Sequence, residues 1–339
     1  MEKACAGFVV ARATAARFAS LCARFLLLGL AALPPAVTAQ YPERPIKYIV
    51  PSAAGGSPDT VARILAAELS KQLGQSILVE NRPGGNVTIG LGAIINSAPD
   101  GYTIGYGNVL GLAINRTFMA KQPYDLDKGV QYIARTGYTP NVLATTSSSP
   151  AKSVSELVNY AKQNPGQLSY GASSLGSTSH IGMELLQIMT GMKLLHVPYK
   201  ASTQIFVDLI AGRLQLTLDN MPALAPHIKA GKLIGLGQTG SVRSKAMPDL
   251  PTIAEAGVPG YEVLAWSGVI VPAGVPNAIA ARLNAEVNKA LASTAVREQY
   301  AAIGYEITGN TTPGQFADFV KKEIAKWADV IKRSGAKHE

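Results

Sequence analysis

The feature that most constrains this chain is an alternation of short β-branched runs with helical stretches, which starts at Tyr41. The run "IKYIV" (46–50) predicts a strand, and the helical stretch after it repeats apolar residues at i, i+4 spacing. Two further strands are predicted at 76–80 and 101–107. This order predicts a mostly parallel sheet with helices on both faces.

The same rhythm restarts near residue 141 and predicts a second α/β unit. The strands of this unit are predicted at 141–146, 167–172, 193–199, 214–220 and 232–238. A helix is predicted at 154–163. The stretch 260–274 predicts a crossing strand, and the last helix is predicted to begin with a capping box of Thr312 and Gln315. A cleft between two such units is a common place for a small ligand.

Residues 1–39 precede this pattern and predict a secretory signal peptide. Three arginines come before the apolar run "FLLLGLAALPPAV" (25–37), and the small residues after it predict cleavage near Ala39. The run is shorter than the roughly 20 residues that span a bilayer. Both cysteines, Cys5 and Cys22, lie in this leader, so the exported chain is expected to have no thiol chemistry.

The net charge of the whole chain is +9, of which the leader contributes three arginines and one lysine less one glutamate. The remaining surplus is spread thinly, and only 6% of residues are aromatic. Nucleic-acid binding needs clustered basic charge, so no nucleic-acid partner is expected. A mild bias toward small anionic ligands is the more natural use of this charge.

The stretch "PSAAGGSPDT" (51–60) predicts an elbow between the first strand and its helix. Its small residues let a ligand oxygen approach backbone N–H groups, and Asp59 or Ser57 is placed to cap the helix. The adjacent glycines and the missing lysine exclude a P-loop and a dinucleotide motif. A plain strand-to-helix turn remains the alternative. The candidate ligand-binding residues here are Ser52, Ala53, Ala54, Gly55 and Ser57.

A second elbow, "LSYGASSLGSTSHIGMELL" (168–186), repeats the design in the second unit. Its hydroxyl groups and the N–H groups of the following helix are hydrogen-bond donors. Two neutral, donor-rich elbows across a cleft would hold an anion without a buried counter-charge, whose desolvation costs several kcal/mol. The candidates are Ser173, Ser177, Thr178 and Ser179.

Three more candidates end strands of the two units. Asp219 follows the apolar run "LQLTL", where open α/β sheets place their ligands, and it could bind a ligand ammonium or hydroxyl group. Gly107 and Asn108 end a strand of the first unit. In each case an ordinary turn residue is the alternative.

The catalytic interpretations fit poorly. A serine hydrolase using the Ser173–His180 loop lacks the G-x-S-x-G elbow and an acid placed to orient His180. His180 and Glu184 lie one turn apart, but the four histidines stand in unrelated contexts, so no metal site is expected. The stretch "GLGQTG" (235–240) matches a dinucleotide motif literally, but the prolines after it deny the required helix.

Segments spread over 41–335 carry a family resemblance, among them "YPERPIKYIVPSAAGGSPDTVAR", "VENRPGGNVTIG", "PDGYTIGYGN", "YGASSLGSTSHIGMELL", "HVPYKAS" and "MPDLPTIAEAGVPGYEVLAWSGVIVPAG". In this order they resemble the Bug family, the TctC-type periplasmic solute receptors of tripartite tricarboxylate transport systems. The resemblance implies an α/β type II periplasmic-binding-protein fold, with two lobes joined by crossing strands and a ligand cleft between them. The implied lobe boundaries are 40–142 with 265–339, and 143–264.

The resemblance also implies a function. A small mono-, di- or tricarboxylate or an amino acid would be held by the two elbows with bridging waters, and Asp219 and the loop after Gly107 would contact its far end. The implied protein is a periplasmic monomer without cofactor or catalytic activity, which closes by hinge motion. A tripartite-type membrane permease or a sensor domain is its expected partner.

Two alternatives stay open at this point: an exported serine hydrolase, and an assembly or signalling protein that has kept the fold and lost uptake. The chain also departs from the family pattern. The family usually has Phe where this chain has Ser52, and Ser174, Leu175 and Ala201 also differ. These residues predict a roomier and more polar pocket.

Overall fold

A computed structural model describes residues 41–172, 174–199 and 202–336 of the chain. The chain divides into two compact units, Met1–Glu43 and Arg44–Glu339, and every element named below belongs to the second. The predicted signal peptide and its cleavage site lie outside the described residues. Within the described ranges, no helix has both the length and the apolar character that a membrane crossing requires.

The second unit is built on one ten-stranded sheet with the order β2-β1-β3-β9-β4-β7-β5-β6, while β8 and β10 also pair with β4. The strands are β1 (Ile46–Val50), β2 (Ile77–Asn81), β3 (Thr103–Asn108), β4 (Val130–Thr146), β5 (Ser169–Ala172), β6 (Leu195–Pro198), β7 (Leu216–Asn220), β8 (Leu233–Gln238), β9 (Leu264–Pro272) and β10 (Glu306–Ile307).

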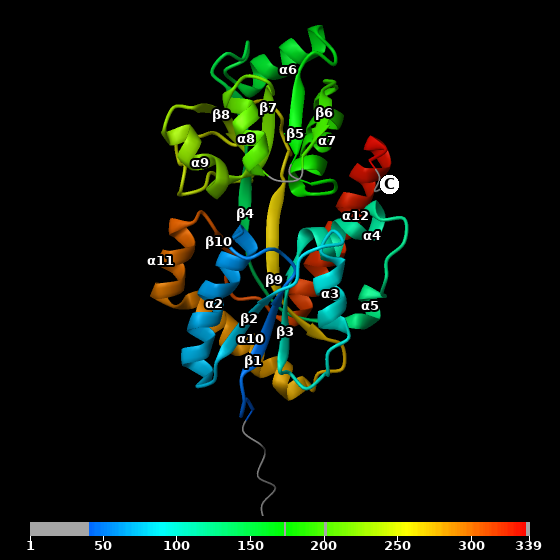
Figure 1. The fold of residues 1–339 in the computed structure, drawn as a ribbon, viewed down its shortest axis with the longest axis vertical. Coiled ribbons are helices and arrows are strands. Elements are labelled where there is room, and N and C mark those ends of the chain that lie inside the picture. The colour runs from blue at the N-terminus through cyan, green and yellow to red at the C-terminus, as the bar shows by residue number, and fades with distance from the viewer. Residues whose placement is uncertain (1–40, 173, 200–201, 337–339) are drawn as a thin grey trace, which may run out of the picture. The chain divides into compact units, whose positions relative to one another are not determined.

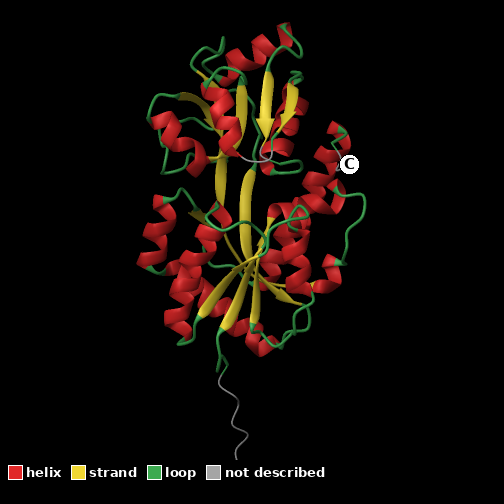
Figure 2. Ribbon diagram, viewed as in Figure 1, coloured by secondary structure: helices red, strands yellow, loops and turns green. Residues whose placement is uncertain are grey.

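Helices surround both ends of this sheet, as Figures 1 and 2 show. They are α2 (Ser57–Leu73), α3 (Thr88–Ile95), α4 (Asn115–Phe118), α5 (Leu126–Gly129), α6 (Val154–Gln163), α7 (Thr178–Thr190), α8 (Ser202–Ile210), α9 (Met221–Lys229), α10 (Asn277–Ala292), α11 (Thr294–Ala302) and α12 (Pro313–Ser334), with a π-helix, η1 (Leu110–Ile114), before α4.

The sheet is mixed, whereas the sequence predicted a mostly parallel one. Parallel pairs occupy its two ends, where β1 pairs with β2 and β3 and where β5 pairs with β6 and β7. The middle is antiparallel, because β4 and β9 run in opposite directions and pair with each other. Each end is therefore an α/β unit of the predicted kind, and the difference lies in the strands that join them.

Strand β4 joins the two ends because it changes partners along its length. Residues 130–140 pair with β9, and residues 141–146 pair with β7 and β8. The chain returns through β9, which pairs with β3 and β4. The result is two α/β lobes joined by crossing strands. The sequence predicted only the second half of β4 as a strand.

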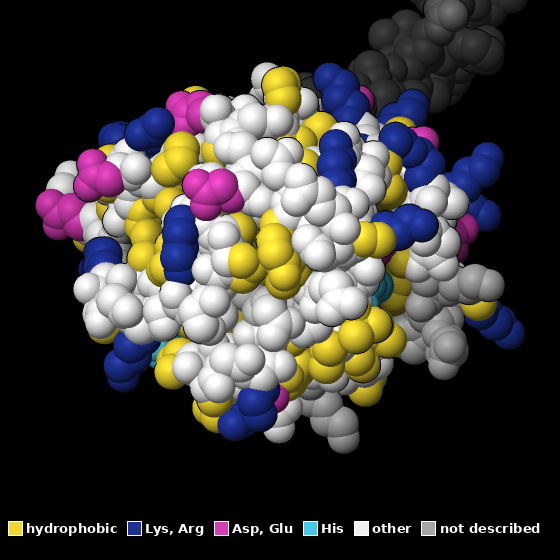
Figure 3. All heavy atoms as spheres, turned by 90° about the horizontal axis from the view of Figure 1, so that it is seen from above, with side chains coloured by type: hydrophobic (Ala, Val, Ile, Leu, Met, Phe, Trp, Pro, Cys, Tyr) yellow, Lys and Arg dark blue, Asp and Glu magenta, His cyan; other side chains and the backbone are white. Residues whose placement is uncertain are grey.

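The last helix, α12, contacts both lobes. It packs against η1 and β4 on one side and against α7 on the other. Its predicted start is confirmed, since Thr312 and Gln315 form a capping box. Phe316, Val320 and Trp327 are buried on its apolar stripe. On the face of the molecule that Figure 3 shows, lysine and arginine side chains are scattered rather than gathered into one patch.

Candidate functional site

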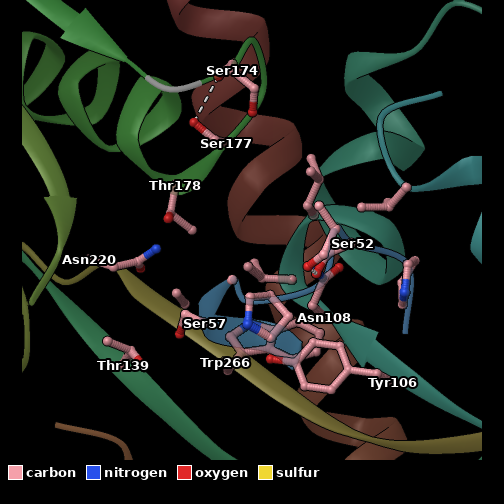
Figure 4. A pocket seen from close by; sticks show the side chains of 18 of the residues that line it. Ser52, Ser57, Tyr106, Asn108, Thr139, Ser174, Ser177, Thr178, Asn220 and Trp266 are labelled. Atoms are coloured by element: carbon pink, nitrogen blue, oxygen red, sulfur yellow. Dashed lines mark hydrogen bonds between the residues drawn. The ribbon is translucent and has the colours of Figure 1, made fainter. Parts of the chain in front are cut away.

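A cavity of about 480 Å³ lies where the two lobes meet. The first lobe contributes its elbow, Val87 and the end of β3, and the second lobe contributes the second elbow and the starts of α8 and α9. Thr139 of β4 and the β9 residues Ala265 and Trp266 complete the lining. None of the lining residues that the structure describes is charged at neutral pH. A ligand here meets hydroxyl, amide and backbone groups (Figure 4).

The first elbow is held from behind by polar contacts. The Asp59 carboxylate accepts hydrogen bonds from the Gly55 N–H at 2.8 Å and from Arg63 Nε at 3.0 Å. Burial alone would raise the pKa of Asp59, but these two bonds, together with Asn81 and the charge of Arg63, outweigh it and lower the pKa. Asn81 Nδ2 donates to the Ser52 carbonyl at 3.1 Å. The Gly55 N–H is thus occupied within the protein.

The helix after this elbow starts without a side-chain cap. Its N-cap residue is Gly56, and neither Ser57 nor Asp59 caps it, so the predicted cap is wrong. Asp59 is used instead on Gly55. Because Gly56, Ser57 and Pro58 line the cavity, the uncapped N-terminal turn of α2 opens into it. Such a turn carries unpaired N–H groups and a partial positive charge.

The second elbow is ordered by its own hydrogen bonds. Ser177 caps α7, where its Oγ accepts from the His180 N–H at 3.3 Å. The same hydroxyl donates to the Ser174 carbonyl at 2.8 Å, as the dashed line in Figure 4 marks. The proton of Ser177 is therefore used inside the loop. Gly176 stands at φ +77°, a region that favours glycine.

Thr178 offers a free donor on the second elbow. Its Oγ1 accepts a hydrogen bond of 3.1 Å from Nδ2 of Asn141, a fully buried residue of β4. Because this oxygen accepts from the protein, its own proton remains for a ligand. Figure 4 shows Thr178 on one side of the cavity, with Ser52 and Asn108 on the other.

Strand β3 contributes two side chains. The Oδ1 atom of Asn108 accepts from the Gly111 N–H at 3.0 Å, which leaves its Nδ2 group for a ligand. Burial raises the pKa of Tyr106 to about 12, so its hydroxyl stays protonated at neutral pH. Gly107 does not line the cavity; a Cβ there would lie 2.6 Å from Leu112.

The floor of the cavity includes an aromatic ring. Trp266 of β9 is 1% exposed, and its indole N–H donates to Glu323 of α12 at 2.7 Å. This bond satisfies the polar atom of the indole, so the ring offers a ligand an apolar surface. The sequence predicted that Trp266 lies in a crossing strand. Nothing in that pattern indicated that its ring would face the cavity.

The far end lies beside a buried carboxylate. Asp219 is 1% exposed and does not line the cavity, whereas its neighbours Asn220 and Ser202 do. Its Oδ2 accepts from Ser202 Oγ at 2.6 Å, and its Oδ1 accepts from the Asn220 N–H at 2.7 Å. Burial raises the pKa of Asp219, and these bonds oppose part of the rise. Asp219 reaches the cavity only through Ser202 and Asn220.

The predicted site residues thus fall into three groups. Those that line the cavity are Ser52, Ala53, Ser57, Asn108, Ser177 and Thr178. Those that do not are Ala54, Gly55, Gly107, Ser179 and Asp219. Ser173 lies outside the described residues, as does Ala201. Among the lining residues that the sequence did not predict, those with polar or aromatic side chains are Tyr106, Thr139, Ser202, Asn220 and Trp266. Asn220 could have been predicted as a site residue, because it is polar and follows Asp219 directly.

His180 has a packing role rather than a catalytic one. Its ring is buried, stacks on His196 at 4.5 Å between ring centroids, and accepts the Gly176 N–H on Nδ1 at 3.1 Å. Burial, with a smaller effect of His196, lowers the pKa of His180 to about 4. Among the described residues, no three or more His, Cys, Asp or Glu side chains gather in a way that could hold a metal ion.

Comparison with known proteins identifies the family. Residues 61–336 match the model of the tripartite tricarboxylate transporter family receptor. Protein BugT of Bordetella pertussis, strain Tohama I, is 38% identical over 310 residues, which cover 91% of this chain and 94% of BugT.

Solved structures give the same result. Rpa4515 of R. palustris with adipate is 39% identical, with a TM-score of 0.80, and the match covers 88% of this chain and 99% of that one. MatC from Rhodopseudomonas palustris with bound malate is 31% identical, with a TM-score of 0.75 and coverage of 86% and 100%. The hydrolase alternative is therefore wrong. The chain belongs to the tripartite tricarboxylate transporter receptor family and is a solute receptor with a periplasmic-binding-protein fold, not an enzyme.

Proposed function

We propose that this receptor is exported and binds a small organic carboxylate in the cavity between its lobes. One observation carries the proposal: the N-terminal turns of α2 and α7, one from each lobe, line a cavity whose described residues are uncharged. Helix N-termini and oriented hydroxyl groups stabilise an anion without a buried cation. The adipate and malate held by the two similar structures support this class of ligand.

The donors suit one carboxylate near the elbows. The N-terminal turn of α2, the Thr178 hydroxyl and the Asn108 amide each have a proton to offer, and waters would bridge the remaining distance. A hydrogen bond to a charged group contributes roughly 1.5–3 kcal/mol. A few such bonds support useful affinity without the desolvation of a partner cation, which costs several kcal/mol.

We also propose that the lobes, with boundaries at 40–142 with 265–339 and at 143–264, close on the ligand by hinge motion. Strands β4 and β9 are the connections that would bend, and both carry irregular register where they pair. The ligand would stabilise the closed state because only there do both elbows reach it.

Membership of the family supports a proposal for the place and partners of the receptor. We propose that it acts in the periplasm as a monomer and delivers its ligand to a tripartite-type permease. A sensor domain is the second candidate partner. Loss of uptake of the identified ligand in a deletion strain would favour transport, and retained uptake with a lost transcriptional response would favour sensing.

A thermal-shift screen with carboxylates, amino acids, amines and sugars tests the ligand class. A carboxylate present at about 100 times its Kd should add about 2.7 kcal/mol of stability, which is roughly 5 °C in Tm for a domain of this size. The variant Thr178→Val should bind about tenfold more weakly, since it loses one donor, while Thr178→Ser keeps the hydroxyl and most of the affinity.

Two results would count against the proposal. One is a screen in which only amines or sugars shift the Tm of the purified protein. The other is a Thr178→Val variant with the affinity of the unmodified receptor, which would remove the second elbow from the ligand site.

A further inference from the structure

Two hydroxyl groups that line the same cavity have opposite hydrogen-bond polarity. Thr178 Oγ1 accepts from Asn141 Nδ2, so its proton is left for the ligand. Ser202 Oγ instead donates its single proton to Asp219 Oδ2 at 2.6 Å. Ser202 can therefore offer the cavity only lone pairs. Thr178 therefore seeks an acceptor on the ligand, and Ser202 seeks a donor.

Asp219, which lies behind Ser202, fixes the direction of the Ser202 hydrogen bond. Asp219 is buried, and its other oxygen accepts the Asn220 N–H at 2.7 Å. An ionised carboxylate has no proton to give, so Ser202 cannot turn its hydroxyl around while Asp219 is charged. While it is ionised, Asp219 also repels a second carboxylate at this end.

Asn220 adds a donor beside this acceptor. In Figure 4 its amide nitrogen points toward Thr178 and into the cavity. Its Oδ1 atom is buried and has no hydrogen-bond partner among the described residues. The far end thus presents one acceptor, Ser202 Oγ, and one donor, Asn220 Nδ2.

A hydroxyl group matches this pair because it both donates and accepts. A carboxylate only accepts and would leave Ser202 without a donor, while an ammonium only donates and would meet the Asn220 amide hydrogens. A buried polar group left unpaired costs affinity. We infer that Ser202 and Asn220 form a hydroxyl subsite and that, if the cavity binds carboxylates as proposed above, it prefers hydroxycarboxylates.

Calorimetric titration of the purified protein with matched ligands tests this inference. Each set keeps the carbon skeleton and changes one substituent, as in succinate, malate and aspartate, and the sets extend over mono- and dicarboxylates of three to eight carbons. In the set that binds best, the hydroxylated member should bind about tenfold more tightly than the unsubstituted one. It should also bind more tightly than the amino-substituted member.

Each other outcome has a defined meaning. Equal affinity within every set would overturn the hydroxyl subsite while leaving carboxylate binding intact. A preference for the unsubstituted dicarboxylate would mean that Ser202 donates to the ligand, and a preference for the amino acid would mean that the subsite takes a cation. If no carboxylate binds, the proposed function fails, and the inference fails with it.

The variant Ser202→Ala separates the subsite from the rest of the cavity. It should reduce the affinity for the hydroxylated ligand about tenfold and leave the unsubstituted ligand within about twofold. Ser174→Ala, also in the lining but in the second elbow, is the matched control and should change both affinities by the same factor. An equal effect of Ser202→Ala on both ligands would contradict the inference.

Discussion

At the scale of single residues, the site is shaped partly by a side chain that does not line the cavity. Glu323 of α12 accepts the indole N–H of Trp266 at 2.7 Å and that of Trp327 at 2.9 Å. Both tryptophans of the chain therefore share one carboxylate. Because Trp266 is fixed from behind, its ring gives the cavity an apolar floor for the carbon chain of a ligand.

His180 should make the stability of the receptor depend on pH. Its pKa is lowered to about 4 in the folded protein, against 6.5 for an ordinary histidine, because it is buried. The unfolded chain therefore binds the proton first as pH falls. The stabilisation is complete above pH 6.5 and is lost as pH falls toward 4. The expected loss between pH 7 and pH 5 is about 2 kcal/mol.

Urea unfolding at several pH values measures this loss, and His180→Asn is the reference variant. Asparagine does not titrate, and its Oδ1 can replace Nδ1 as the acceptor of the Gly176 N–H. As pH falls from 7 to 5, the unfolding free energy of the unmodified protein should fall relative to that of the variant. A difference that stays constant over this range would show that His180 does not titrate as expected.

At the scale of elements, the second elbow contacts the first lobe through a glycine. A Cβ added at Gly176 would lie 2.7 Å from the ring of Phe118 in α4, and the backbone there has φ +77°. Gly176→Ala should therefore cost about 1–2 kcal/mol of stability from backbone strain. It should also lower ligand affinity about tenfold or more, because the elbow must move away from Phe118.

Gly166→Ala is the matched control for this variant. Gly166 has φ +76°, but a Cβ there would meet no atom within 4 Å. It should lose a similar amount of stability and keep its ligand affinity. Denaturant unfolding and calorimetry on both variants separate strain from contact, and equal ligand affinities in the two would rule out a role for the Phe118 contact.

At the scale of the whole molecule, binding should change the distance between the lobes. The proposed hinge predicts a smaller radius of gyration by small-angle X-ray scattering when the ligand found in the screen is added. At a subsaturating ligand concentration, Thr178→Val should show a smaller change than the unmodified protein. A radius of gyration that stays constant at saturation would contradict hinge closure and leave ligand binding unaffected.

The sequence by itself determined the local units of this protein. The strand–elbow–helix at 46–73 was predictable because β-branched runs, glycines and i, i+4 apolar spacing act over a few residues. The capping box of α12 was predictable for the same reason, since Thr312 and Gln315 are three residues apart. The order of such segments was also enough to indicate the family.

Only the tertiary structure decided how these units share their polar groups. Asp59 looked like a helix cap, but Arg63 and the Gly55 N–H take its carboxylate. Asp219 looked like a ligand contact, but it lies behind Ser202 and Asn220. A hydrogen bond depends on distance and direction in space. Ser202 of α8 and Asp219 of β7 come from different elements, and even the nearby partners of Asp59 are set by the path of the backbone in the elbow, so local sequence patterns do not reveal which group donates to which.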